Sequence, residues 1–428
     1  MRRSSDHPEH GTAGGASGAR AVARCDELGA SPYSDEPGLL FRPYLGGGHG
    51  ATLDRLATWM REAGMSARID AAGNLLGRYE GLAADAPALL IGSHVDSVRD
   101  GGRYDGMLGV MLGIEAVAGF AARGRRFPFA LEVIGFGDEE GSRFPVSMLA
   151  TRAVAGALDG QDLDLRDSAG TTLAEALASF GLDIAQLPAA ARRRDEIVAY
   201  VEAHIEQGPV LEAEDRALGV VSAIAAQYRF RAVVGGVAGH AGTMAMHLRR
   251  DALAAAAEMV LAVETIGGGG PGDLVATVGR MEVGPGVTNV VPGEVAFSID
   301  IRAGTDAARD RAADAVRRAL GGIAARRQVS LGLELQQDLP ATPCDAGLTA
   351  LMGQAVRTAT GEDAPRVLVS GAGHDAMVMA RLAPMSMLFL RCAGGISHHP
   401  AEAVRDADVE LALRAMTDFI ERYERRGP

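Results

Sequence analysis

One stretch of the sequence limits the possible folds more than any other. The apolar run Ala88–Ile91 ends in Gly92-Ser93, and His94 and Asp96 follow, with Asp105 after a pair of glycines. This pattern is typical of a buried parallel strand that delivers polar side chains to its C-terminal end, where α/β sheets carry their chemistry. A polar loop without a function would show the same pattern. The sequence predicts an α/β fold, and later segments decide whether this loop is a site.

The composition narrows the functions that are open to the chain. Its 428 residues are enough for two domains, and a formal net charge of −13 argues against a nucleic-acid partner. No apolar run approaches the roughly 20 residues of a membrane span. All 42 basic residues are arginine, which excludes a Schiff-base lysine, and the three cysteines suggest neither disulfides nor a zinc site. We expect a cytoplasmic enzyme with no membrane or nucleic-acid partner.

The order of the expected elements indicates that one domain is inserted into another. Strands and helices alternate before residue 222 and again after residue 337, as in an α/β domain. Between these segments, residues 223–336 predict a strand, a helix, two strands, a helix and a strand, the order of a ferredoxin-like unit. Residues 1–20 are rich in glycine, alanine and serine and lack the apolar stretch of a signal peptide, so a disordered extension is expected there.

Three later segments add side chains that can bind metal. Asp138-Glu139-Glu140 follows a predicted core strand, His204 ends another, and His398 lies in a loop near the C-terminus. Each segment alone is most simply a solvated turn or a capped histidine. Together with His94 and Asp105, however, they supply the oxygen and nitrogen donors of a dinuclear Zn²⁺ or Mn²⁺ centre. A carboxylate that stays off the metal must take the proton of the attacking water, and two consecutive glutamates can divide these tasks.

Taken in order, these motifs resemble those of the M20 metallopeptidase clan, in its amidase/carbamoylase branch, from about residue 23 to residue 425. The resemblance implies a mixed-sheet, metallopeptidase-like catalytic domain formed by residues 21–222 and 337–428. It also implies that residues 223–336 form an inserted ferredoxin-like (α+β) lid and dimerisation domain.

The resemblance also implies roles for individual residues of the catalytic domain. Two divalent ions, Zn²⁺ or Mn²⁺, are expected. His94, Asp105 and His204 would hold one ion, and Asp105, Glu140 and His398 would hold the other. Glu139 would be the general base. Asp96 is also expected to be a catalytic residue, because it would hold the His94 ring in its tautomer.

The chain also matches the substrate-binding motifs of this branch. The segments 236–243 and 288–293 follow its motifs and contain His240 and Asn289, and Arg302 comes soon after. By the resemblance, His240 stabilises the oxyanion and reaches into the partner's site of a homodimer. Asn289 and Arg302 would hold the substrate carboxylate, for which a guanidinium fork is well shaped. Further substrate contacts are expected from Gln207, Gly371 and His374, although His374 can also be only a loop histidine.

Within the branch, residues 24–45 are most similar to the allantoate amidohydrolases. The expected reaction is hydrolysis of the ureido C–N bond of a small carboxylate, with allantoate as the first candidate, and with release of ammonia and carbon dioxide. N-carbamoyl-L-amino acids and a related ureide or dipeptide are alternative substrates. The chain departs from the branch at Gly46–Gly48, Ala150-Thr151 and Met244-Ala245, none of which touches an expected ligand. A non-catalytic metal- or ligand-binding protein is the alternative outside the class, and the spare carboxylate of Glu139 argues against it.

Overall fold

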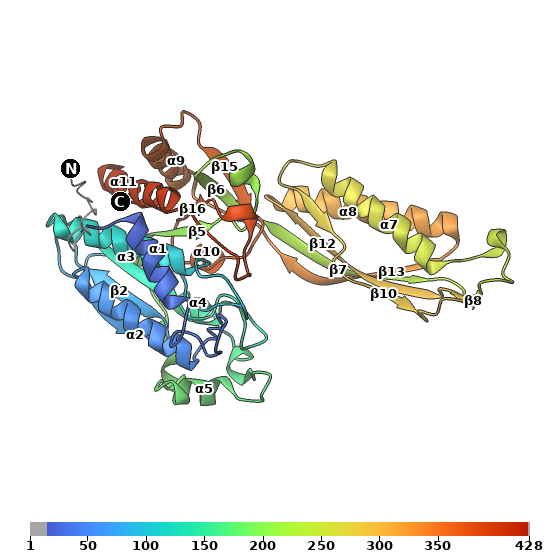
Figure 1. The fold of residues 1–428 in the computed structure, drawn as a ribbon, viewed down its shortest axis with the longest axis horizontal. Helices are drawn as coiled ribbons and strands as arrows, with labels where there is room; N and C mark the ends of the chain where they lie inside the picture. Colours follow the sequence, from blue (N-terminus) through green and yellow to red (C-terminus); the bar gives the residue numbers. More distant parts are fainter. Residues whose placement is uncertain (1–14, 427–428) are drawn as a thin grey trace, which may run out of the picture. The chain divides into compact units, whose positions relative to one another are not determined.

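The computed structural model describes residues 15–426, which divide into two compact units (Figure 1). The first unit comprises the chain up to Gly219, then Ala350–Pro365 and the chain from Arg381. The second comprises Val220–Thr349 and Arg366–Ala380. It therefore includes residues 337–349 and 366–380 besides the expected insertion of 223–336. Within residues 15–426, no helix has both the length and the apolar character that crossing a membrane requires.

A mixed sheet forms the centre of the first unit, as predicted. Its strands follow the order β1-β2-β4-β3-β5-β16, in which β1, β2 and β4 are antiparallel neighbours and β4, β3, β5 and β16 run parallel. Every residue of β3 and β4 is buried, which explains their continuous apolar runs. The strands are β1 Ser66–Ile69, β2 Leu75–Tyr79, β3 Ala88–His94, β4 Ala130–Phe136, β5 Ile197–Ile205 and β16 Met385–Leu390.

Helices pack on this sheet (Figure 1). α3 lies against β3, β4 and β5 and packs with α1 and α11, whereas α2 packs on the hairpin β1–β2. α3 is buried over most of its circumference, in agreement with its almost entirely apolar sequence. The helices are α1 Gly18–Leu28, α2 Gly47–Glu62, α3 Met107–Ala122, α4 Leu149–Val154, α5 Leu173–Ser179, α6 Val210–Ala213, α9 Ala346–Thr360 and α11 Asp406–Arg426.

Part of the segment expected to be disordered is helical. Residues 1–14 lie outside the described residues, but α1 begins at Gly18, inside the segment expected to be disordered. Ser17 caps the helix by accepting the N–H of Arg20, and Arg20 donates to the fully buried carboxylate of Glu115 on α3. A buried carboxylate needs a cationic or hydrogen-bonding partner. This long-range pair orders the segment, and the local composition gave no sign of it.

The second unit contains the predicted ferredoxin-like sheet. Its strands are antiparallel throughout, in the order β10-β12-β7-β13 with β9 beside β12, and α7 and α8 pack on it. The first of the two strands expected between the helices is divided into β9 and β10. The elements are β7 Ala226–Gly235, β8 Gly239–His240, α7 Ala252–Gly268, β9 Val275–Thr277, β10 Met281–Gly284, β11 Val290–Val291, β12 Glu294–Ala303, α8 Asp306–Arg327 and β13 Ser330–Leu339.

Three further strands and a short helix complete the chain. β6 leads from the first unit into the second and pairs there with β14 and β15. Their bounds are β6 Leu218–Ile224, β14 Thr342–Pro343, β15 Arg366–Ser370 and α10 Ala376–Met379.

Candidate functional site

All five predicted metal ligands come together in the first unit. They are carried by the C-terminal ends of four parallel strands that are neighbours in the sheet, or by the loops that follow them. Ligand atoms of His94, Asp105 and His204 lie within 4.8 Å of one another, and so do those of Asp105, Glu140 and His398. The two groups share Asp105. The resemblance implied the same two groups, and their role as metal ligands remains a prediction.

Asp105 lies at the centre of the site. Its Oδ1 is 3.2 Å from Nε2 of His204 and 3.8 Å from Nε2 of His94, and its Oδ2 is 3.1 Å from Nε2 of His398. Nε2 of His398 is also 3.5 Å from Oε1 of Glu140. One carboxylate thus presents one oxygen to each group, as a bridging ligand must.

Two histidine rings are oriented by backbone carbonyl groups. Nδ1 of His94 is 3.1 Å from the carbonyl oxygen of Asp96, and Nδ1 of His204 is 2.9 Å from that of Ile205. In the tautomer that donates from Nδ1, both Nε2 atoms carry lone pairs, and these atoms lie only 3.5 Å apart. In this tautomer two lone pairs and an oxygen of Asp105 lie close together, and either protons on the Nε2 atoms or a metal cation between them would relieve their repulsion. The residues therefore fit a divalent metal ion.

Burial and neighbouring charges perturb the carboxylates of the site. Burial alone would raise the pKa of Asp105, but hydrogen bonds with His204, His398 and His94 hold it well below its usual value. Burial raises the pKa of Glu140 to about 7, and the charges of Asp105 and Asp96 add to this rise against the opposing effect of His94. A bound cation would favour the ionised form of Glu140.

Asp96 contacts both the His94 ring and the turn that carries the two glutamates. Its carboxylate accepts the backbone N–H of Glu139 at 3.0 Å and that of Glu140 at 3.1 Å. The carboxylate is 3.5 Å from Nδ1 of His94, farther than the backbone carbonyl of the same residue. The backbone of Asp96 therefore makes the closer contact with the ring, and its side chain fixes the turn that carries both glutamates.

Glu139, the predicted base, lies beside the metal-binding groups. Its carboxylate belongs to a cluster with His94 and Glu140 whose atoms are within 4.8 Å of one another. The turn that carries it follows β4, the neighbour of β3 in the sheet. Its side chain is partly exposed, so solvent can reach it.

Gln207 contacts the central carboxylate. Its amide Nε2 donates to both oxygens of Asp105 at 3.1 Å and to Oγ of Ser397 at 3.1 Å. Ser397 in turn donates to Oδ2 of Asp105 at 3.0 Å. Gln207 was expected to contact substrate, whereas here it helps to orient Asp105. Sequence reasoning missed Ser397, and its position directly before His398 was the only available sign.

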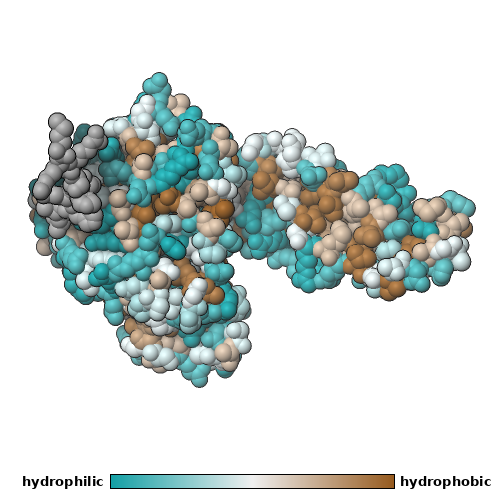
Figure 2. Space-filling model, viewed as in Figure 1, coloured by the Kyte–Doolittle hydropathy of each residue, from teal (hydrophilic) through white to brown (hydrophobic). Residues whose placement is uncertain are grey.

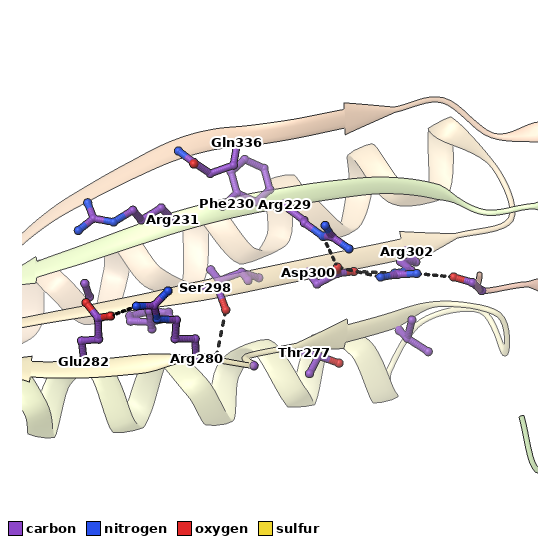
Figure 3. A pocket seen from close by; sticks show the side chains of 16 residues that line it. Arg229, Phe230, Arg231, Thr277, Arg280, Glu282, Ser298, Asp300, Arg302 and Gln336 are labelled. Carbon is purple, nitrogen blue, oxygen red and sulfur yellow. Dashed lines mark hydrogen bonds and ion pairs between the residues drawn. The ribbon is translucent and has the colours of Figure 1, made fainter. Parts of the chain in front are cut away.

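The remaining predicted substrate residues belong to the second unit. Arg302 lies in a pocket of about 780 Å³ on the sheet of that unit, beside Asp300, Arg229 and Gly371 (Figure 3). Nε and Nη2 of Arg302 donate to Asp300 at 2.8 and 3.1 Å, and Nη1 donates to the carbonyl oxygen of Gly371. Three of the five guanidinium N–H groups are thus engaged, which leaves one on each terminal nitrogen. His374 is buried, with Nε2 2.7 Å from Oγ of Ser370.

The structure does not bring Asn289 and Arg302 together within one chain. Asn289 and His240 lie at the short two-stranded sheet β8–β11, beyond the end of the larger sheet where Glu294 pairs with Gly235. Arg302 lies near the opposite end of β12, where it pairs with Gln227. The eight residue steps from Glu294 to Arg302 span about 27 Å of extended strand. These two residues therefore cannot form one carboxylate clamp inside a single chain.

Histidines and carboxylates gather at the ends of the parallel strands, and a ferredoxin-like unit accompanies them. These features define a hydrolase of the metallopeptidase class. The chain belongs to Peptidase family M20/M25/M40, whose sequence model matches residues 90–422. It is an enzyme of this hydrolase family.

Known proteins similar to the chain agree with this class. A probable allantoate deiminase of Oryza sativa subsp. japonica is 41% identical over 94% of this chain and 87% of its own length. An N-carbamoyl-L-amino acid amidohydrolase of Geobacillus stearothermophilus is 42% identical over 82% of this chain and 85% of its own length. The crystal structure of a hydantoinase/carbamoylase family amidase from Burkholderia multivorans has a TM-score of 0.87 and 34% identity, and the match covers 95% of this chain and 98% of that one.

Proposed function

We propose that the chain hydrolyses the ureido C–N bond of a small carboxylate, with allantoate as the first candidate substrate. The observation that carries the proposal is the convergence of four other candidate metal ligands on Asp105, with the additional carboxylate of Glu139 beside them. The substrate class is supported by the allantoate deiminase of Oryza sativa, which is similar over most of the chain. An N-carbamoyl-L-amino acid is the second candidate, because the amidohydrolase of Geobacillus stearothermophilus is equally similar over a shorter part.

The proposed site holds two divalent ions, Zn²⁺ or Mn²⁺. His94, Asp105 and His204 would hold the first, and Asp105, Glu140 and His398 the second. A donor set made only of oxygen and nitrogen atoms suits these metals better than it suits a metal that prefers sulfur. When bound, such a pair of ions supplies an activated water and polarises the carbonyl group that the water attacks.

Glu139 is proposed to take the proton of the attacking water and to pass it to the leaving nitrogen. This requires a carboxylate near the ions but not needed as a ligand, and Glu140 already supplies the ligand from the same turn. The hydrogen bonds from the backbone of Glu139 and Glu140 to Asp96 hold that turn in place. Each glutamate can then keep a separate role although they are consecutive in the sequence.

Recognition of the substrate carboxylate is proposed to use Arg302, through the two N–H groups that Asp300 and Gly371 leave available. His374 is proposed to act nearby, since its neighbour Gly371 accepts from Arg302. Within one chain His240 and Asn289 lie at the other end of the sheet, so we assign them to the site of a second copy. The second unit is thereby proposed to act as a lid and as the dimerisation unit of a homodimer.

The surface of the second unit supports such an assembly. Most of the large apolar side chains exposed among the described residues belong to this unit, and apolar residues gather on the face shown in Figure 2. Met246, Leu248 and Val287, which are close in sequence to β8 or β11, are 76%, 68% and 51% exposed. Clusters of exposed apolar side chains are typical of surfaces that another protein covers.

A substrate panel tests the proposed function. Metal-free protein reconstituted with Mn²⁺ or Zn²⁺ should release ammonia from allantoate faster than it hydrolyses N-carbamoyl-L-amino acids, ureidoglycolate or a dipeptide. A preference for N-carbamoyl-L-amino acids would select the second candidate. Absence of turnover with every substrate, in protein shown to bind two ions, would favour a non-catalytic binding protein.

A further inference from the structure

Glu402 connects two loops of the candidate metal site. It lies four residues after His398, and its backbone N–H donates to the carbonyl oxygen of His399 at 3.0 Å. Its side-chain Oε1 accepts the backbone N–H of Tyr104 at 2.8 Å and that of Asp105 at 3.1 Å. One side chain thus joins the loop that carries His398 to the backbone of the residue at the centre of the site.

The contact between these loops is unusually close at Gly102. A β-carbon built on Gly102 would lie 2.1 Å from Cδ of Glu402 and 2.2 and 2.3 Å from its two carboxylate oxygens. No β-carbon tolerates such distances, so the carboxylate packs directly on the α-carbon of this glycine. The Asp105 loop is therefore held by Glu402 at three successive points, namely Gly102 by packing, and Tyr104 and Asp105 by hydrogen bonds.

A contribution to folding stability alone does not explain why the carboxylate of Glu402 is buried. Glu402 is 5% exposed, and its Oε2 has no hydrogen-bond partner among the described residues. Its hydrogen-bond donors are neutral backbone amides and not an arginine, in contrast to the buried Glu115, which pairs with Arg20 and Arg24. Burial of a carboxylate with so few partners is costly. Such a cost is typically retained where a precise geometry is required.

We infer that Glu402 is a positioning residue for the metal centre: it fixes the backbone of Asp105 and the separation between the Asp105 and His398 loops. The inference rests on the proposed metal-binding role of these ligands. Because Asp105 is shared by both groups, a small displacement of its backbone changes the oxygen that faces each ion. Side chains that orient metal ligands typically change metal affinity by about 10- to 100-fold when they are removed.

Glu402→Ala and Glu402→Gln separate a positioning role from a need for charge. Removal of the acceptor in Glu402→Ala should weaken the binding of Zn²⁺ or Mn²⁺, measured by competition with a chelator, by about 10- to 100-fold. Glu402→Gln keeps an oxygen in the position of Oε1 and should remain within about threefold of the wild-type affinity. Equal losses in the two variants would overturn the inference, as would unchanged affinity in Glu402→Ala.

Gly102→Ala perturbs the same contact without removing the carboxylate, and it carries the test if Glu402→Ala fails to fold. The new methyl group should displace the side chain of Glu402 and weaken metal binding in the same way. In the double variant Gly102→Ala/Glu402→Ala, the loss should be no larger than in Glu402→Ala alone, because both changes break one contact. Additive losses would contradict a shared mechanism.

Glu115→Ala is the matched control. It also removes a buried carboxylate of the first unit, but one that pairs with α1 and not with a ligand loop. It should lower the melting temperature and leave metal affinity unchanged. Since affinity is measured without substrate, a wild-type protein that binds two ions but hydrolyses no ureide would refute only the proposed reaction. A wild-type protein that binds no ion would refute the metal assignment and this inference together.

Discussion

Arg302 lies near one end of strand β12, and Asn289 lies beyond its other end, at the short sheet β8–β11, so about 27 Å of strand separates them. Both match substrate-binding motifs, and both suit the recognition of a carboxylate. If both act on one substrate molecule, they come from different chains. This separation gives the proposed homodimer a functional reason, because the first unit holds the five proposed metal ligands, whereas His240 and Asn289 belong to the second unit.

Replacement of Arg302 by lysine should impair recognition of the substrate carboxylate. Lysine keeps the charge but cannot offer two N–H groups in a fixed plane while also bonding to Asp300 and Gly371. We expect KM for allantoate to rise by about 10- to 100-fold, the equivalent of roughly 1.4–2.8 kcal/mol. Arg231→Lys, an exposed arginine that lines the same pocket, is the control. An equal loss with an analogue that lacks the carboxylate would rule out a contact between Arg302 and the substrate carboxylate.

Mixed dimers test the shared site. A His240→Ala subunit and a Glu139→Gln subunit should each be nearly inactive, but together they should regain activity, since one site of the heterodimer then holds both wild-type residues. Asn289→Ala paired with Glu139→Gln should behave in the same way.

Arg302→Ala paired with Glu139→Gln provides the control for these mixtures. Both residues are proposed to serve the site of their own chain, so no site of this heterodimer is intact and activity should stay low. If heterodimers form and neither the His240→Ala nor the Asn289→Ala mixture regains activity, His240 and Asn289 do not complete the partner's site.

Asp96→Ala should loosen the turn that carries Glu139 and Glu140. The backbone N–H groups of both glutamates lose their acceptor, so kcat and the occupancy of the ion held by Glu140 should fall together, by about 10- to 100-fold in affinity. Asp251→Ala is a matched control, because its carboxylate also accepts two successive backbone N–H groups, at the start of α7. It should reduce stability by about 1 kcal/mol without changing metal binding. Full metal occupancy in Asp96→Ala would contradict the assigned role.

Removal of the metal ions should destabilise the protein. Any ion that binds only the folded state adds stability, about 4 kcal/mol at a free concentration of 1,000 times Kd. Thermal unfolding followed by circular dichroism should therefore show a lower melting temperature after treatment with a chelator, and Zn²⁺ or Mn²⁺ should restore it. His204→Ala, which lacks one ligand, should respond less to added metal. A melting temperature that is insensitive to the chelator would contradict tight binding of ions at these residues.

The sequence predicted the strand ends of the site because burial leaves a clear pattern. Apolar runs such as Ala88–Ile91 mark parallel strands of the core, and the C-terminal ends of such strands meet at one edge of the sheet. His94, Glu140 and His204 could therefore be placed near one another before any coordinates were known. The ferredoxin-like order of the second unit followed from its alternating periodicities in the same way.

The supporting contacts of the site could not be predicted in this way. Glu402 and Ser397 lie in an irregular loop, and their partners are about 300 residues away in the sequence. Neither periodicity nor composition reports which loops pack together. The role of Asp96 was assigned to its side chain, although the closer contact with His94 comes from the backbone, which every residue type possesses. The contact of α1 with Glu115 could not be predicted for the same reason as the contacts of Glu402. It depends on a buried charge that is distant in the sequence.

The substitution Glu139→Gln tests the central claim most directly, namely that Glu139 moves protons beside two ions held by other residues. Turnover of allantoate and the number of bound ions should be measured on the same preparation, with Glu62→Gln, an exposed glutamate of the first unit, as the control. We predict that Glu139→Gln binds two ions as the wild type does, while kcat falls by about 10²- to 10⁴-fold. Near-normal turnover, or the loss of an ion, would contradict the assignment of Glu139 as the general base.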